Sequence, residues 1–143
     1  MGEAIVCTEP EFRKAEAAFT AECGDWRWVV SEPAEHAVAA EVRASRARIA
    51  VLGVARYSGP LYEALAEQAG SAQALIARYG VGCDGIDRAR CAATGIILAN
   101  TPGTLDTSVA EHALALLLSV ARRVPFLDAR MRGIRDGGKV AGT

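Results

Sequence analysis

Short apolar runs alternate with longer amphipathic segments along the first hundred residues. The apolar runs, each bounded by turn residues, predict five strands at 4–7, 26–30, 48–54, 73–79 and 96–100. Between them, apolar residues recur at helical spacing and predict four helices at 11–21, 34–44, 61–69 and 86–94. Strands that alternate with helices are typical of a parallel sheet, because parallel neighbours need crossover connections.

The third apolar run is continuous from Ile49 to Val54, which suits a strand that is covered on both of its faces. We therefore expect an α/β fold, with a flavodoxin-like open five-stranded parallel sheet and helices on both faces. In such sheets the ligand crevice lies beyond the carboxyl ends of the strands.

The pattern changes after residue 107, where we place the end of a substrate-binding domain (1–107). Ser108 and Glu111 have the spacing of a capping box, with Ser108 as N-cap of one long helix in 108–133. Pro125 should kink or break this helix near Val124. Its first half is mostly apolar and needs burial on several sides, so we expect an interdomain or dimerisation helix. The glycine-containing segment 134–143 is typical of a linker tail.

Composition and charge exclude several classes of protein. The chain is 51% hydrophobic and 23% charged, with a formal net charge of −1, so no basic field favours nucleic acid. The first residues lack a targeting pattern, and the longest apolar run is far below the roughly 20 residues of a membrane span. We expect a cytoplasmic protein that binds neither nucleic acid nor membrane.

Four cysteines and two histidines show no metal-ligand spacing, so we expect no metal site. The simplest interpretation is reduced thiols that serve as small apolar residues. Cys83 is the alternative case, because it lies within a glycine-rich turn where a thiol can be reactive.

That turn, with glycines at 80, 82 and 85, has the GxGxxG pattern of a dinucleotide fingerprint. Two features argue against this interpretation. The turn follows the fourth strand, and the next strand ends in Asn100, where a ribose-binding carboxylate is expected. We therefore interpret it as an anion-binding turn for a small substrate, with a simple tight turn as the alternative.

The sheet edge places other polar groups beside this turn. Arg78 precedes it, and Arg56, Tyr57 and Ser58 follow the third strand. The predicted substrate-binding residues are Arg56, Tyr57, Ser58, Arg78, Val81 and Gly82, the last two through their backbone amides.

Three segments resemble the D-isomer-specific 2-hydroxyacid dehydrogenase family: 77–87 (ARYGVGCDGID), 95–103 (GIILANTPG) and 108–114 (SVAEHAL). The resemblance implies that Val81 and Gly82 hold a substrate carboxylate, and that Val109 approaches the nicotinamide of NAD or NADP. It implies an enzyme that reduces 2-oxo acids and oxidises small D-2-hydroxy acids. One departure is Gly85, where many family members carry asparagine.

The family's catalytic arginine, glutamate and histidine lie in later segments, together with its true coenzyme fingerprint. We therefore expect no catalytic residue in this chain, and neither Glu111 nor His112 fills that role. The coenzyme-binding Rossmann domain is expected to be absent, so that the chain alone binds no coenzyme and is inactive. Its partners would be a small 2-hydroxy or 2-oxo acid, the missing coenzyme domain and a second copy bound through the long helix.

The alternative is a non-catalytic truncated module that binds or dimerises. Two other classes with this fold fit less well. A receiver domain needs an acceptor aspartate where Gly53 and Val54 stand, and a flavodoxin needs a phosphate loop where the chain has 8–11 (TEPE). Fold alone does not decide function.

Overall fold

The computed structural model describes residues 3–133. The chain divides between Thr104 and Leu105 into two compact units, which are treated separately below. This division lies three residues before the end of the domain predicted from the sequence.

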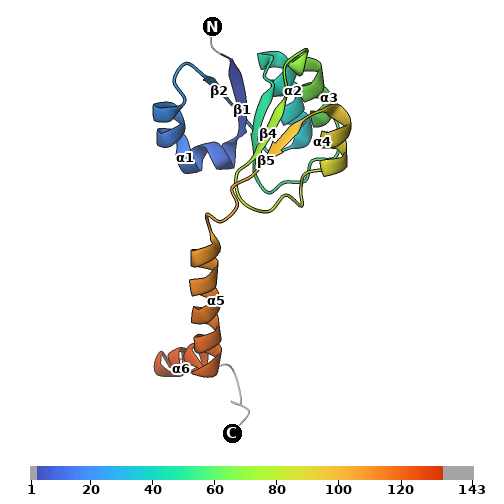
Figure 1. Cartoon of the computed structure of the whole chain (residues 1–143). Helices are drawn as coiled ribbons and strands as arrows, with labels where there is room; N and C mark the ends of the chain where they lie inside the picture. Colours follow the sequence, from blue (N-terminus) through green and yellow to red (C-terminus); the bar gives the residue numbers. More distant parts are fainter. Residues whose placement is uncertain (1–2, 134–143) are drawn as a thin grey trace. The chain divides into compact units, whose positions relative to one another are not determined.

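The first unit is an open sheet of five parallel strands (Figure 1). The strands are β1 (Ala4–Thr8), β2 (Arg27–Ser31), β3 (Ile49–Leu52), β4 (Leu75–Arg78) and β5 (Ile97–Ala99). Their order in the sheet is β2-β1-β3-β4-β5, and every neighbouring pair is parallel. The helices are α1 (Glu9–Glu22), α2 (Glu35–Ser45), α3 (Leu61–Ala69) and α4 (Arg88–Thr94). The predicted fold class and the flavodoxin-like strand order are confirmed.

Alternate residues of the strands supply two apolar layers, because successive side chains point to opposite faces. On one face, Val6, Leu52 and Ile76 are fully buried in the larger core cluster, which includes residues of α2, α3 and α4. On the other face, Cys7 is buried and Phe19 of α1 packs on the smaller cluster. Figure 1 shows α1 on one side of the sheet and the other three helices on the opposite side.

Local sequence features mark both ends of α4. Asp87 caps α4, because its side chain accepts a hydrogen bond from the backbone N–H of Arg90 at 3.1 Å. Gly95 follows α4 in the left-handed conformation that glycine adopts without strain.

The second unit contains two helices, α5 (Asp106–Ala121) and α6 (Val124–Met131). The predicted break is confirmed: Arg123 is left-handed, and Pro125 lies in the first turn of α6, where its missing N–H costs nothing. The predicted capping box is wrong. Ser108 lies inside α5, because the N–H of Val109 already donates to the carbonyl of Leu105 at 2.9 Å.

The predicted linker, 134–143, lies outside the described residues. Among the helices of residues 3–133, none has the length and hydropathy that crossing a lipid bilayer requires.

Candidate functional site

The carboxyl ends of the parallel strands meet at one edge of the sheet, and the strand order reverses between β1 and β3. Ligands of open α/β sheets bind at this edge, near such a reversal. The segments that follow β1, β3, β4 and β5 here contain Thr8, the loop 53–60, the glycine turn 80–85 and Asn100. All of them belong to the first unit.

Hydrogen bonds hold the carbonyl groups of the glycine turn. The side-chain amide of Asn100 donates to the carbonyl of Val81 at 2.8 Å, and the N–H of Thr101 donates to the carbonyl of Gly80 at 3.1 Å. Within residues 3–133, no acceptor is bonded to the N–H of Val81 or to that of Gly82. The turn is therefore anchored through its carbonyls, and Val81 and Gly82 are exposed residues, so their amides are candidates for binding an anion.

The guanidinium of Arg78 lies against the turn. A Cβ built on Gly80 would come within 2.9 Å of Arg78 Nη1, and Gly80 has a φ of +135°. The positive φ favours glycine here, since a side chain would be strained, and an added Cβ would also make the flexible guanidinium move. Arg78 also donates to the carbonyl of Tyr79. The structure thus places one positive charge beside Gly80, the first glycine of the turn.

The three predicted residues of the loop after β3 differ in their exposure to solvent. Arg56 and Ser58 are exposed, whereas the side chain of Tyr57 is 1% exposed. The Tyr57 hydroxyl donates to the carbonyl of Pro33 at 3.3 Å, and burial raises its pKa to about 12. Tyr57 therefore holds the loop in place, and of these three residues only Arg56 and Ser58 are exposed to solvent.

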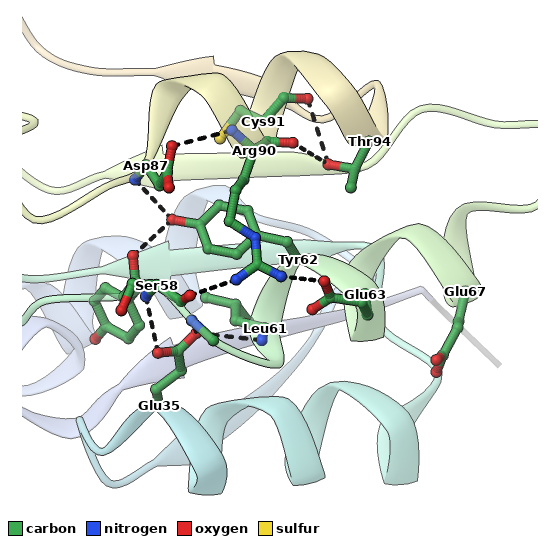
Figure 2. A network of polar contacts seen from close by, with 12 residues as sticks. Glu35, Ser58, Leu61, Tyr62, Glu63, Glu67, Asp87, Arg90, Cys91 and Thr94 are labelled. Carbon is green, nitrogen blue, oxygen red and sulfur yellow. Dashed lines mark hydrogen bonds and ion pairs between the residues drawn. The ribbon is translucent and has the colours of Figure 1, made fainter.

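Glu35, at the start of α2, was missed by sequence reasoning and fixes the same loop (Figure 2). Its carboxylate accepts hydrogen bonds from three backbone amides, those of Ser58 (2.9 Å), Gly59 (2.7 Å) and Leu61 (3.3 Å). These amides lead into α3, whose positive end favours an anion. One carboxylate thus satisfies the Leu61 donor that the helix itself leaves unpaired, and two donors of the loop before it.

Figure 2 also shows how the β3 loop is joined to the segment after the glycine turn. The Tyr62 hydroxyl donates to the carbonyl of Tyr57 and accepts from the N–H of Asp87, both at 2.8 Å. Arg90 pairs with Glu63 and donates to the carbonyl of Ser58. The two loops that carry the predicted substrate groups are therefore tied together.

A buried carboxylate lies at the reversal of strand order. Glu11 is 4% exposed, accepts from the Thr8 hydroxyl at 2.5 Å and pairs with Lys14 at 3.1 Å. Its carboxylate packs against the Cα of Gly53, where any Cβ would overlap it. Burial opposes ionisation, but the hydrogen bonds from Thr8 and Lys14 outweigh it and lower the pKa of Glu11.

Because of the Glu11 carboxylate, we expect the free energy of unfolding to fall in acid. Because the folded-state pKa is lowered, Glu11 adds stability above pH 4.5, which is lost as the pH falls through the folded-state value. The variant Glu11→Gln should lower the free energy of unfolding at pH 7 and flatten its decline in acid. Urea titrations between pH 3 and pH 7 measure this, with Glu16→Gln on the exposed face of α1 as control. A Glu11→Gln profile parallel to that of the wild type would contradict the assignment.

The cysteines behave as apolar residues. Cys7, Cys83 and Cys91 are buried and all four thiols are free. Burial raises the pKa of Cys7 to about 12 and also raises that of Cys91. The Cys83 thiol donates to the carbonyl of Val81 and so supports the glycine turn from inside. No cluster of three metal-ligating side chains occurs within residues 3–133.

A family model and a number of relatives match this chain in sequence. The model is the D-isomer specific 2-hydroxyacid dehydrogenase, catalytic domain, and it matches residues 12–137. A D-3-phosphoglycerate dehydrogenase of Mycobacterium tuberculosis is 45% identical over 58 residues, which are 41% of this chain and 11% of the relative. A glyoxylate reductase of Thermococcus litoralis is 48% identical over 58 residues, 18% of its length.

Solved structures share the fold at lower identity. The pyruvate reductase of Chlamydomonas reinhardtii is 24% identical with a TM-score of 0.66. The match covers 99% of this chain and 40% of the reductase chain. A glyoxylate/hydroxypyruvate reductase of Sinorhizobium meliloti, in complex with NADP and malonate, is 24% identical with a TM-score of 0.63. The match covers 97% of this chain and 41% of the Sinorhizobium meliloti chain. This chain therefore spans less than half of either solved chain.

Proposed function

The chain belongs to the D-isomer specific 2-hydroxyacid dehydrogenase family, and from this premise we propose that it is a substrate-binding lobe. The parent enzyme would be an NAD(P)-dependent oxidoreductase that acts on the CH–OH group of small D-2-hydroxy acids and reduces the corresponding 2-oxo acids. One observation carries the proposal: among residues 3–133, no acceptor is bonded to the amides of Val81 and Gly82, which lie in a turn whose carbonyls at Gly80 and Val81 are already bound.

In this proposal the substrate carboxylate accepts hydrogen bonds from the two amides. Hydrogen bonds to an ionised group are roughly twice as strong as neutral ones, and Arg78 adds a charge beside the same turn. Arg56 and Ser58 would contact the rest of the substrate from the neighbouring loop, which Glu35 and Tyr57 hold in place. The lobe thus orients the acid before chemistry occurs.

The glycine turn does not suit a dinucleotide. The side chain at the end of β5 is Asn100, and its amide is bonded to Val81 instead of offering a carboxylate to a ribose. NAD or NADP, which would exchange a hydride with the substrate, is therefore assigned to a separate coenzyme-binding domain. Val109, exposed in α5, is the residue of this chain proposed to meet the coenzyme.

A lobe of this kind should be inactive by itself. Mixed with NADH or NADPH and with glyoxylate, hydroxypyruvate or pyruvate, the chain should show no turnover above background. Adding the separately purified coenzyme-binding domain of a glyoxylate reductase should produce coenzyme oxidation that depends on both proteins. Turnover by the chain alone would show that catalytic residues have been misassigned. Bound acid with no turnover in the mixture would favour the non-catalytic alternative.

The second candidate function is self-association through α5. Within the described residues, none of α5 is buried, and Leu114, Leu117 and Leu118 are each at least 60% exposed. A contiguous apolar surface of this kind marks an interaction site. We propose a homodimer in which this helix faces a second copy.

Sedimentation velocity at micromolar concentration tests the dimer. We expect the chain to sediment as a dimer, and the double variant Leu114→Asp with Leu118→Asp, one turn apart, to sediment as a monomer. Thr107→Asp, exposed at the start of α5, adds a charge outside the leucine surface and serves as control. A monomeric wild type would exclude this function.

A further inference from the structure

The two loops of the site approach each other closely at Gly85. A Cβ built on Gly85 would lie less than 3.0 Å from the carbonyl oxygen of Ala55 and 3.4 Å from that of Val54. These are backbone atoms, which cannot turn aside as a flexible side chain can. Gly85 does not have a positive φ, so the space and not the backbone conformation requires glycine here.

Several contacts press the loops together at this point. The N–H of Tyr57 donates to the carbonyl of Gly85 at 2.8 Å, and Tyr57 forms a parallel bridge with Ile86. Beside this bridge, the buried hydroxyl of Tyr62 joins the carbonyl of Tyr57 to the N–H of Asp87. These hydrogen bonds therefore keep the two loops close together, and no room is left for an added carbon at Gly85.

The spacing matters because the two loops carry different parts of the site. The β3 loop carries Arg56 and Ser58, and the glycine turn carries the amides of Val81 and Gly82. A side chain at Gly85 would have to push the loops apart, and so would change the distance between these groups. Tightly packed interiors respond to even one added carbon.

We propose that Gly85 is a positioning residue that sets substrate size by holding the Arg56 loop close to the amides of the glycine turn. This inference rests on the proposed function and narrows it to 2-oxo acids with small substituents, such as glyoxylate. Acids with a bulky substituent, such as phenylpyruvate, should bind less well, because the two loops stand close together at Gly85.

The test compares Gly85→Ala and Gly85→Asn with the unaltered chain. In ¹⁵N-labelled protein without ligand, both variants should shift the amide signals of the β3 loop and of the glycine turn. Titration with each acid should show that the preference for glyoxylate over phenylpyruvate falls roughly 10-fold. Gly95→Asn is the matched control, because Gly95 is left-handed, which asparagine tolerates, and has open space around it.

Tyr62→Phe is a second variant that keeps the core volume and removes the hydroxyl joining the loops. It should relax the preference in the same direction even if the Gly85 variants fail to fold. An unchanged preference in the folded variants, or unmoved loop signals, would overturn the role of Gly85. If the unaltered chain binds neither acid at Val81 and Gly82, the proposed function fails, and the ligand-free spectra still decide whether Gly85 sets the spacing.

Discussion

Replacing Glu35 by alanine should lower the free energy of unfolding by about 3 kcal/mol. The carboxylate accepts from the amides of Ser58, Gly59 and Leu61, and its loss leaves three donors without their partner at the start of α3. Hydrogen bonds to charged groups contribute about 1.5–3 kcal/mol each, and water reaching the freed amides recovers part of that sum. Urea unfolding followed by circular dichroism measures the change.

Two further variants show whether the carboxylate itself is responsible. Glu35→Gln keeps one oxygen acceptor without the charge and should lose about half as much stability. Glu32→Ala removes an exposed glutamate that precedes the helix and should change the stability by less than about 0.5 kcal/mol. Equal stability of Glu35→Ala and Glu32→Ala would show that Glu35 does not hold the β3 loop.

Replacing Arg78 by methionine should weaken the binding of glyoxylate about 10-fold without changing the stability of the fold. The guanidinium lies against Gly80 of the turn that is proposed to hold the carboxylate. Arg78 is only partly buried, which limits the contribution to about 1.4 kcal/mol, since solvent screens the charge. Isothermal titration at low ionic strength measures the affinity.

Arg13→Met is the control, because Arg13 lies in α1, pairs with Glu9 and is 74% exposed. It removes the same charge from the chain and should leave the affinity for glyoxylate unchanged. Similar losses of affinity in Arg78→Met and Arg13→Met would show that Arg78 acts only through the net charge of the protein.

Most of the fold could be predicted because each helix and strand is determined by a short, continuous stretch of the sequence. Five short apolar runs, each followed by an amphipathic segment, leave few arrangements besides a doubly covered parallel sheet. Asp87, Gly95 and Pro125 mark boundaries through chemistry that acts within one turn of the chain. Ser108 was misleading, because α5 starts earlier and the capping-box spacing occurs inside the helix.

The site was predicted less completely because its supporting contacts join distant segments. Glu35 bonds to amides more than 20 residues away, and Tyr62 reaches Asp87 across 25 residues. Nothing near either residue in the sequence indicates these partners. Tyr57 was grouped with exposed residues by its position after β3, but its ring lies in the core. Asn100 was recognised from the sequence as an argument against dinucleotide binding. In the structure its side-chain amide also anchors the glycine turn.

The most direct measurement follows the amide signals of Val81 and Gly82 while ¹⁵N-labelled protein is titrated with a small ligand. Glyoxylate should shift both signals in a saturable way, and ADP at the same concentrations should leave them unchanged. Shifts caused by ADP or pyrophosphate alone, with none from glyoxylate, would mean that the turn binds a nucleotide phosphate and that the proposed role in substrate binding is wrong.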